Sequence, residues 1–185
     1  MVEDAAGRNK PTAIVVMGVA GSGKTVIGEG LAERLGLPML EGDSFHPEAN
    51  VRKMSSGTPL TDDDRWPWLD AIGKAIGETP GGVIVACSAL KRVYRERLVA
   101  AAGRPLLFLF LDSSRETLAA RIGNRKGHFM PAGLLDSQLA TLEPPGPGEP
   151  ALRIDIGPPV AAVVAAAVAA LRSASGLEIA DTPPG

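Results

Sequence analysis

The sequence predicts an α/β fold with three layers, in which a parallel sheet of five strands is covered by helices on both faces. Short apolar runs that suit buried strands alternate along the chain with longer patterns of helical period, the order typical of strand–helix–strand units. The first apolar run is followed at once by a glycine-rich loop over residues 18–25 and then by a helical pattern. The alternation predicts the layers, and the loop predicts what one end of the sheet binds.

The elements follow one another in regular order. The expected strands are residues 12–17, 38–41, 83–87, 105–111 and 152–156. The expected helices are residues 24–36, 47–56, 66–78, 90–102, 114–126, 131–142 and 158–173. Ser113 and Glu116 have the spacing of a capping box at the start of the fifth helix. Residues 143–150 are too rich in proline and glycine for regular structure and are expected to form a surface loop.

The totals favour one soluble domain. A chain of 185 residues is long enough for a sizeable core, and we expect a flexible leader over 1–10, a single domain over 11–173 and a flexible tail over 174–185. The net charge of −2 argues against a nucleic-acid binder. The first ten residues lack the apolar core of a secretory signal, and the apolar run 160–171 is too short to span a bilayer. We therefore expect neither a nucleic-acid nor a membrane partner.

Cys87 is the single cysteine of the chain. One cysteine excludes an internal disulfide, and this favours a reducing compartment, the cytoplasm. We interpret Cys87 as a small buried apolar residue.

The loop Gly18-Val-Ala-Gly-Ser-Gly-Lys-Thr25 fits the phosphate-binding pattern G-x-x-x-x-G-K-[ST]. In a strand–loop–helix unit the backbone N–H groups of such a loop surround an anion, and the helix N-terminus adds partial positive charge. Lys24 is expected to reach the β- and γ-phosphates of ATP, and the Thr25 hydroxyl to ligate Mg²⁺. The candidate nucleotide-binding residues of the loop are Gly18, Val19, Ala20, Gly21, Ser22, Gly23, Lys24 and Thr25. The alternative is a glycine-rich turn between two core elements.

The segment Glu41-Gly-Asp-Ser-Phe-His-Pro47 follows the second expected strand. Ligands collect at the carboxyl ends of parallel strands, so this segment is expected to face the γ-phosphate. We assign Asp43 to accept the proton of a substrate alcohol and to orient its oxygen, and Glu41 to hold Mg²⁺ through water. The alternative for Asp43 is a helix cap. His46 is either a substrate contact or part of the turn packing.

Cationic residues in three further segments are candidates for an anionic substrate. Lys53 and Arg65 flank a run of three aspartates at 62–64, which we interpret as a turn before a helix whose first turn holds Pro67. Ser88 ends the third strand, and its hydroxyl is expected to face the pocket. Lys91, Arg92 and Arg95 then open a helix, where cations oppose the helix dipole unless an anion binds there. The alternative for each is a solvated residue paired with Glu96. Trp66 and Trp68 are expected to pack.

Residues 121–131 have the composition of a lid. Arg121 and Arg125 are four residues apart and share one helical face, and Gly123 and Gly127 provide hinge freedom. Small phosphotransferases close such a lid over ATP to exclude water and neutralise developing charge. The alternative is a solvated charged face.

Taken in order, the motifs resemble those of the gluconokinases, small phosphate-loop kinases related to the shikimate and nucleoside monophosphate kinases. The matching segments are GVAGSGKT (18–25), EGDSFHP (41–47), NVRKMSSGTPLTDDDRWPWL (50–69), CSALKRVYRERL (87–98) and RKGHFMPAGLLDSQLATLEPP (125–145). The first is shared by many unrelated NTPases, whereas the segments around Asp62–Leu69 and Cys87–Arg95 are far more specific.

The resemblance implies ATP- and Mg²⁺-dependent phosphorylation of D-gluconate on its 6-hydroxyl, giving 6-phosphogluconate and ADP. It implies a nucleoside-monophosphate-kinase-like fold with a lid, and a homodimer. It places Asp43 at the acceptor hydroxyl, Arg65 at a substrate carboxylate, Arg121 against the nucleotide base and Arg125 near the phosphates. The candidate catalytic residues are then Asp43, Lys24 and Arg125, with His46, Lys53, Arg65, Ser88, Arg92 and His128 as candidate substrate ligands.

The residues favour the same substrate class without the resemblance. A sugar acid has a carboxylate at one end and an alcohol at the other, so it needs cations on one side and a carboxylate base near the γ-phosphate. Two rivals stay open: a kinase for another small acid such as shikimate, or for a nucleoside monophosphate, and a non-catalytic ATP-binding regulatory module.

Overall fold

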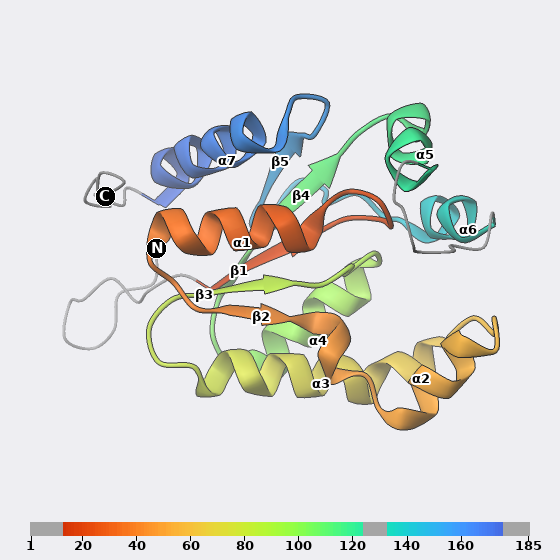
Figure 1. The fold of residues 1–185 in the computed structure, drawn as a ribbon. Coiled ribbons are helices and arrows are strands. Elements are labelled where there is room, and N and C mark those ends of the chain that lie inside the picture. The colour runs from red at the N-terminus through yellow and green to blue at the C-terminus, as the bar shows by residue number, and fades with distance from the viewer. Residues whose placement is uncertain (1–12, 124–132, 176–185) are drawn as a thin grey trace.

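A parallel five-stranded sheet in the order β2-β3-β1-β4-β5 forms the centre of the protein (Figure 1). The computed structural model describes residues 13–123 and 133–175. The strands are β1 (Ala13–Met17), β2 (Met39–Glu41), β3 (Val83–Ala86), β4 (Leu106–Asp112) and β5 (Ala151–Asp155). All four neighbouring pairs run parallel, as the sequence predicts.

Helices cover both faces of this sheet. Figure 1 shows α1 and α7 on one face and α3 and α4 on the other. The helical elements are α1 (Lys24–Leu35), the 3₁₀ turn η1 (Gly42–Phe45), α2 (Glu48–Ser55), α3 (Asp62–Glu78), α4 (Arg92–Ala102), α5 (Arg115–Gly123), α6 (Leu134–Thr141) and α7 (Val160–Ser175). The predicted three-layer α/β/α architecture is confirmed.

The alternation of side chains along β1 divides the interior into two cores. Val15 and Met17 point to the core shared with α3 and α4, whereas Ile14 and Val16 point to the core shared with α1 and α7. Successive side chains of a strand face opposite sides of a sheet, so a strand covered on both faces is apolar throughout. β1 is buried along its whole length, and this central position fixes the loop that follows it.

The start of α3 differs from the prediction. The sequence indicates a helix from residue 66 after a turn of aspartates, but α3 begins at Asp62. Thr61 caps it: its hydroxyl accepts the Asp64 N–H at 3.2 Å, and the Asp64 carboxylate accepts the Thr61 N–H at 2.9 Å. Acidic side chains in a first turn also interact favourably with the helix dipole. Pro67 therefore lies inside the helix, beyond its first turn.

The predicted leader (1–10) and part of the predicted tail and lid lie outside the described residues. α5 ends at Gly123, and the described chain resumes at Gly133, so Arg125, Gly127 and His128 are not among the residues that can be placed. α7 continues to Ser175, past the predicted end at residue 173. The lid, leader and tail stay predictions.

The carboxyl ends of the strands meet at one edge of the sheet. The loop 18–23 follows β1, η1 follows β2, and Ser88 lies just after β3. α5 and α6 lie at the same edge (Figure 1). Because open parallel sheets bind ligands at this edge, the site is assembled here from segments far apart in the sequence.

Candidate active site

The loop after β1 has the backbone of a phosphate cradle. Gly18, Gly21 and Gly23 all have positive φ, at 152°, 80° and 85°. Gly23 is the N-cap of α1 and brings no side-chain hydrogen bond to it. The first N–H groups of a helix have no partner inside the helix, so this end of α1 is suited to an anion.

Gly18 shows why the loop needs glycine there. A Cβ atom at this position would lie 2.8 Å from Ser22 Oγ and 3.0 Å from the Leu111 carbonyl oxygen. The Gly18 N–H donates to the Ser88 carbonyl at 3.3 Å. The loop thus begins wedged between the ends of β3 and β4, with no room for a side chain.

The side chains of the loop divide between the interior and the site. Val19, Ala20 and Ser22 are buried, so these three offer a phosphate only their backbone. The Lys24 ammonium donates to the Val19 carbonyl at 3.2 Å and thus folds back over its own loop. The Ala20 N–H donates to Oε1 of Gln138, from α6, at 2.6 Å. This contact joins the loop to the helix that follows the undescribed segment.

Arg121 lies beside the loop, at the end of α5. A Cβ atom on Gly23 would be 3.9 Å from its guanidinium nitrogen Nη1. The other terminal nitrogen donates to the carbonyl oxygens of Ile156 and Pro158, after β5. Arg121 is therefore held next to the start of α1, on the side where the sequence predicts the nucleotide.

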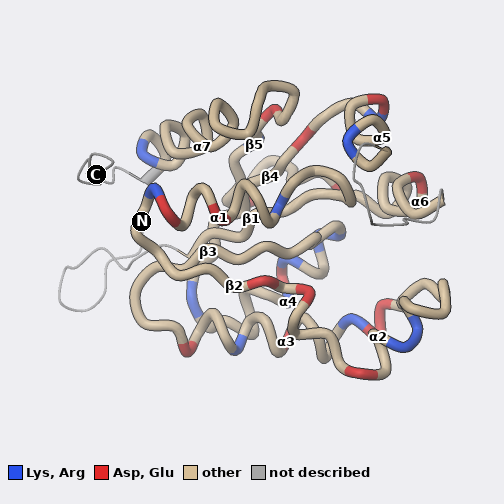
Figure 2. Tube along the Cα trace, in the orientation of Figure 1, with Lys and Arg blue, Asp and Glu red and all other residues tan. Residues whose placement is uncertain are grey.

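The two carboxylates at the end of β2 have different surroundings. Glu41 Oε2 accepts the Thr25 hydroxyl at 2.7 Å, so this carboxylate faces the start of α1. Asp43, in η1, is 81% exposed at its side chain. Gly42 between them lies against β3, because a Cβ atom there would be 2.4 Å from the Ala86 carbonyl oxygen. The acidic positions at the end of β2 are visible in Figure 2.

His46, at the end of the turn that contains Asp43, is tightly packed. Its ring stacks on Trp68 with centroids 4.2 Å apart and an interplanar angle of 11°. Its Nε2 lies 4.0 Å from Asp43 Oδ1, and its Nδ1 lies 3.4 Å from the Asn50 amide nitrogen. The expected packing role of Trp68 is confirmed, since its side chain is buried and its indole N–H donates to the Gly42 carbonyl at 2.8 Å.

Cys87 is a buried residue just after β3. Burial raises the pKa of its thiol to about 12, so it remains a neutral thiol. Lys24, Glu41 and Asp43 are each close enough for their charges to act on that thiol and change its pKa. The charges of the loop lysine and of the two carboxylates thus reach the same buried thiol, which lies just after β3.

Arg65 and Lys91 both lie near the ring of Tyr94. The Arg65 guanidinium carbon lies 5.6 Å from the ring centroid and the Lys91 ammonium 5.5 Å. The Asp62 carboxylate accepts hydrogen bonds from the Tyr94 hydroxyl and from Lys91 Nζ, the latter at 3.0 Å. These two bonds, the Tyr94 one first, lower the pKa of Asp62. Asp62 Oδ1 also lies 3.9 Å from Arg65 Nη1, so one ionised carboxylate has both cations as neighbours.

The remaining predicted cations have partners within the protein. Lys53 Nζ binds both carboxylate oxygens of Asp64 at 2.7 Å, and Arg65 donates to the Leu60 carbonyl at 2.5 Å. The Arg92 side chain pairs with Glu96 at 2.9 Å along α4, the alternative that the sequence leaves open. Its backbone N–H, at the helix start, donates to Glu143.

Arg95 is buried at 1% exposure. It binds Glu149 through two nitrogens, at 2.6 and 2.9 Å, and donates further hydrogen bonds to carbonyl oxygens. The anion that this position of α4 requires is therefore a glutamate of the loop before β5.

The chain is similar to proteins of known family. The profile of a family described as "AAA domain" matches residues 14–145. A gluconokinase of Gluconobacter oxydans (strain 621H) is 53% identical over 148 residues, covering 78% of this chain and 83% of that protein. The thermosensitive gluconokinase of Escherichia coli (strain K12) is 45% identical over 155 residues, covering 80% and 81%. The crystal structure of a gluconokinase from Sinorhizobium meliloti 1021 has a TM-score of 0.84 at 50% identity and covers 91% of this chain and 96% of that one.

The chain belongs to the gluconokinase family. The resemblance inferred from the five motifs is confirmed by identities spread over most of the chain. Among residues 13–123 and 133–175, none of the helices has the length and apolar character that crossing a membrane requires.

The donor set of this gluconokinase-family site fits a hard cation at Thr25. Within the described ranges no three His, Cys, Asp or Glu side chains converge as a metal cage. Mg²⁺ in phosphoryl-transfer sites does not need one, since it keeps several waters and takes few protein ligands besides phosphate. The Thr25 hydroxyl and the Glu41 carboxylate, 2.7 Å apart, are oxygen donors of this kind.

Four residues of the site were not singled out from the sequence: Gln138, Asn50, Asp62 and Tyr94. Gln138 lies 118 positions from Ala20, and no local pattern links a glutamine on a helix to a distant loop. The composition around Asp62 suits a turn, although Thr61 and Asp64 have the spacing of a helix cap. Asn50 and Tyr94 act through partners that only the fold brings near.

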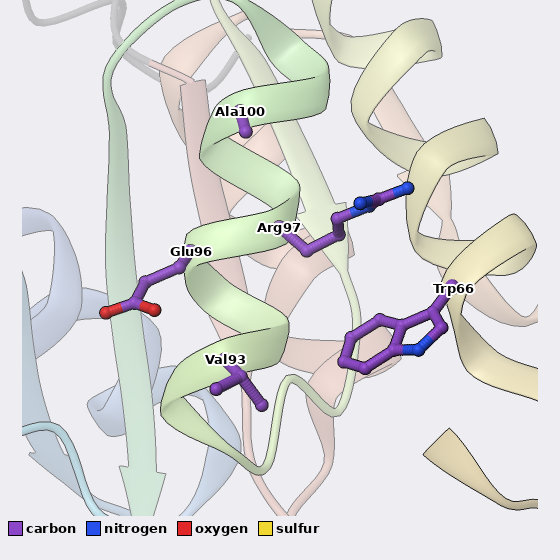
Figure 3. Close-up of a pocket in the computed structure, with 5 residues that line it drawn as sticks. All are labelled: Trp66, Val93, Glu96, Arg97 and Ala100. Atoms are coloured by element: carbon purple, nitrogen blue, oxygen red, sulfur yellow. The ribbon is translucent and has the colours of Figure 1, made fainter. Parts of the chain in front are cut away.

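A separate hollow of about 340 Å³ lies between α3 and α4. Its lining residues are Trp66, Val93, Glu96, Arg97 and Ala100. Figure 3 shows Trp66 and Arg97 directed into the space between the helices, while Glu96 points away from it. Trp66 also meets Tyr94 edge to face, at 5.7 Å between centroids.

Proposed function

We propose that this protein is a gluconokinase, which transfers the γ-phosphoryl group of ATP to the 6-hydroxyl of D-gluconate and releases 6-phosphogluconate and ADP. One observation carries the proposal: the Thr25 hydroxyl at the start of α1 donates to the Glu41 carboxylate at 2.7 Å, so the phosphate loop meets the segment that carries Asp43. A phosphate cradle and a carboxylate for the acceptor thus lie together, in a family whose relatives are named gluconokinases.

On the nucleotide side, the backbone of residues 18–25 binds the phosphates and Lys24 leaves the Val19 carbonyl to reach the β- and γ-phosphates. Arg121 lies against the nucleotide, beside Gly23. Thr25 directly and Glu41 through water would hold Mg²⁺, which would neutralise charge on the phosphate oxygens. Arg125 and His128, outside the described residues, stay predicted phosphate and substrate contacts.

On the acceptor side, Asp43 accepts the proton of the gluconate hydroxyl and aims its oxygen at the γ-phosphorus. Phosphoryl transfer needs positioning and charge stabilisation more than covalent chemistry from the protein. Arg65 binds the gluconate carboxylate, because a guanidinium matches a carboxylate in two-point geometry. Lys53 and Ser88 stay predicted substrate ligands, and the Lys91 ammonium lies near the same Tyr94 ring as Arg65.

A coupled assay of ADP release tests the proposal across D-gluconate, other sugar acids, shikimate and nucleoside monophosphates. We expect turnover with gluconate above every other acceptor. Turnover with another acceptor but not gluconate would reject the substrate and keep the chemistry. ATP binding without any acceptor-dependent turnover would support the regulatory alternative instead.

The assembly and location are proposed on the same family grounds. We infer a homodimer, which light scattering after size-exclusion chromatography measures directly. A cytoplasmic location agrees with Cys87, a buried free thiol.

A further inference from the structure

His46 has a fixed orientation. Its side chain is only 6% exposed, and its ring lies flat on Trp68. Trp68 is itself held by the hydrogen bond from its indole N–H to the Gly42 carbonyl. A ring that is stacked and enclosed in this way has few orientations available, so the direction of each ring nitrogen is determined by the fold.

The contact with Asn50 determines which nitrogen of His46 carries the proton. The Asn50 amide nitrogen donates to the Asp64 carbonyl at 2.8 Å, and a carbonyl oxygen only accepts, so this nitrogen is correctly oriented. The same nitrogen lies 3.4 Å from His46 Nδ1. An amide nitrogen cannot accept, so Nδ1 must be the unprotonated acceptor and the proton is on Nε2.

Nε2 is the nitrogen that faces Asp43. Two charged groups act on the ring: Asp43, whose charge raises the pKa of His46, and Arg65, whose charge lowers it. Burial is the largest effect, and the net result lowers the pKa below its ordinary value. The ring is therefore neutral at pH 7, with a single N–H directed at the carboxylate.

We propose that His46 is a positioning residue whose Nε2–H anchors one oxygen of the Asp43 carboxylate, so that the other oxygen faces the acceptor hydroxyl. This inference rests on the proposed role of Asp43. The present separation of 4.0 Å is longer than a hydrogen bond, and a movement of the exposed carboxylate by about 1 Å closes it. His46 thus acts through Asp43 and needs no contact with the substrate.

The reason for such an anchor is the exposure of Asp43. A carboxylate that is 81% exposed has several rotamers and water on most sides. Catalysis requires one of these rotamers, in line with the phosphate. Anchoring one oxygen restricts the choice and affects turnover more than ATP binding.

Two substitutions separate positioning from packing. His46→Phe keeps a ring on Trp68 but has no N–H, whereas His46→Gln loses the ring and places an amide N–H near the position of Nε2. We expect kcat to fall roughly tenfold in H46F, the scale of one hydrogen bond to a charged group, with the KM for ATP unchanged. H46Q should keep more of the turnover although its Tm is lower. If kcat instead follows Tm, with H46F the more active, the proposal is overturned.

The Asp43→Asn background distinguishes this inference from the proposed function. We expect H46F to change kcat little when Asp43 is already replaced, because no carboxylate remains to anchor. A full tenfold loss in that background overturns the inference alone. Unchanged kcat in the single variant D43N rejects the role of Asp43 and the anchor with it.

The position of the proton is measurable without activity. The chain has two histidines, so the ¹⁵N signals that disappear in H46Q belong to His46. We expect a protonated Nε2 and an unprotonated Nδ1 at pH 7 in the wild-type protein. A protonated Nδ1 contradicts the proposal even if H46F is inactive or unfolded.

Discussion

The two halves of the site are built in different ways. On the proposed nucleotide side the backbone forms the binding surface: three glycines with positive φ shape the loop, and the side chains of its other members, Val19, Ala20 and Ser22, are buried. On the proposed acceptor side, side chains form the binding surface. Asp43 and His46 come from η1 and its C-cap, and Arg65 comes from α3. His46 stacks on Trp68, and Arg65 donates to the Leu60 carbonyl.

This difference predicts which kind of substitution disrupts each half. A cradle made of backbone depends on whether the chain can adopt its conformation, so it fails through steric clashes. A pocket made of side chains depends on pairs, so it fails when one partner is removed. Thr25 and Glu41 are the hydrogen-bonded pair at the junction of the two halves.

Removing the one charged side chain of the loop should have the largest effect. Lys24→Ala should weaken ATP binding and lower kcat by about 10²–10³, because a donor to developing charge is lost. The ADP-release assay and ATP titration calorimetry measure the two effects. Lys74→Ala removes an exposed lysine that pairs with Glu78 on α3 and is the control. An active K24A variant would remove Lys24 from phosphate contact.

The acceptor side should respond differently. Asp43→Asn should lower kcat by a factor on the order of 10² or more while ATP affinity stays nearly intact. Asp63→Asn, an exposed carboxylate in the first turn of α3, is the matched control. A loss of ATP affinity equal to that of K24A would show that the two halves cannot be separated.

In each half a glycine lies against a backbone carbonyl and has no space for a methyl group. Gly18→Ala and Gly42→Ala should each lower the free energy of unfolding by about 1–3 kcal/mol, through clashes with Leu111 and Ala86 carbonyls respectively. Gly36→Ala isolates the conformational cost, because Gly36 has φ of 63° and no neighbouring atom within 4 Å. Urea unfolding measures all three. An effect of G42A smaller than that of G36A would contradict the tight packing of η1 on β3.

Gln138 is a side chain whose contact is with the backbone of the phosphate loop, so it tests the comparison from the other direction. Gln138→Leu removes the acceptor of the Ala20 N–H and should weaken ATP binding by about fivefold, near 1 kcal/mol. Ser137→Ala, its exposed neighbour on α6, should leave the affinity unchanged. Equal ATP affinity in Q138L and the wild type would mean that the loop keeps its shape without this contact.

The smallest effect concerns the acceptor side at low pH. The hydrogen bond from Lys53, and then those from Thr61, lower the pKa of Asp64 from 3.8 to about 2. A lowered pKa in the folded state means that the stabilisation is complete above pH 3.8 and is lost as the pH falls towards 2. The difference in Tm between the wild type and Asp64→Asn should shrink over this range. A difference in Tm that stays constant down to pH 2 would show that protonation of Asp64 does not weaken its bond with Lys53 over this range.

The elements and the loop were predictable because their signals are local. A strand buried on both faces must be apolar, and a loop that lies against phosphate needs glycine, so residues 13–25 show their structure in their own composition. The start of α3 was misplaced for a related reason. The aspartates at 62–64 suit a turn as well as a first helical turn, and the contact of Asp64 with Thr61 decides between them.

The charged side chains were not predictable in the same way. Arg95 was expected to need an anion at the start of α4, and its partner Glu149 lies 54 positions away. Lys91 finds Asp62 across 29 positions and Asn50 finds Asp64 across 14. A long side chain pairs with whatever the fold places within its reach, and a sequence does not encode those distances locally.

The sequence by itself determined the sheet, its order of elements, the phosphate loop and the family, because each depends on residues that are neighbours in the chain. Only the tertiary structure decided which carboxylate meets Thr25, which nitrogen of His46 faces Asp43 and which helix holds the loop through Gln138. Those contacts depend on the directions of side chains from separate elements, and packing sets these directions after the strands have come together.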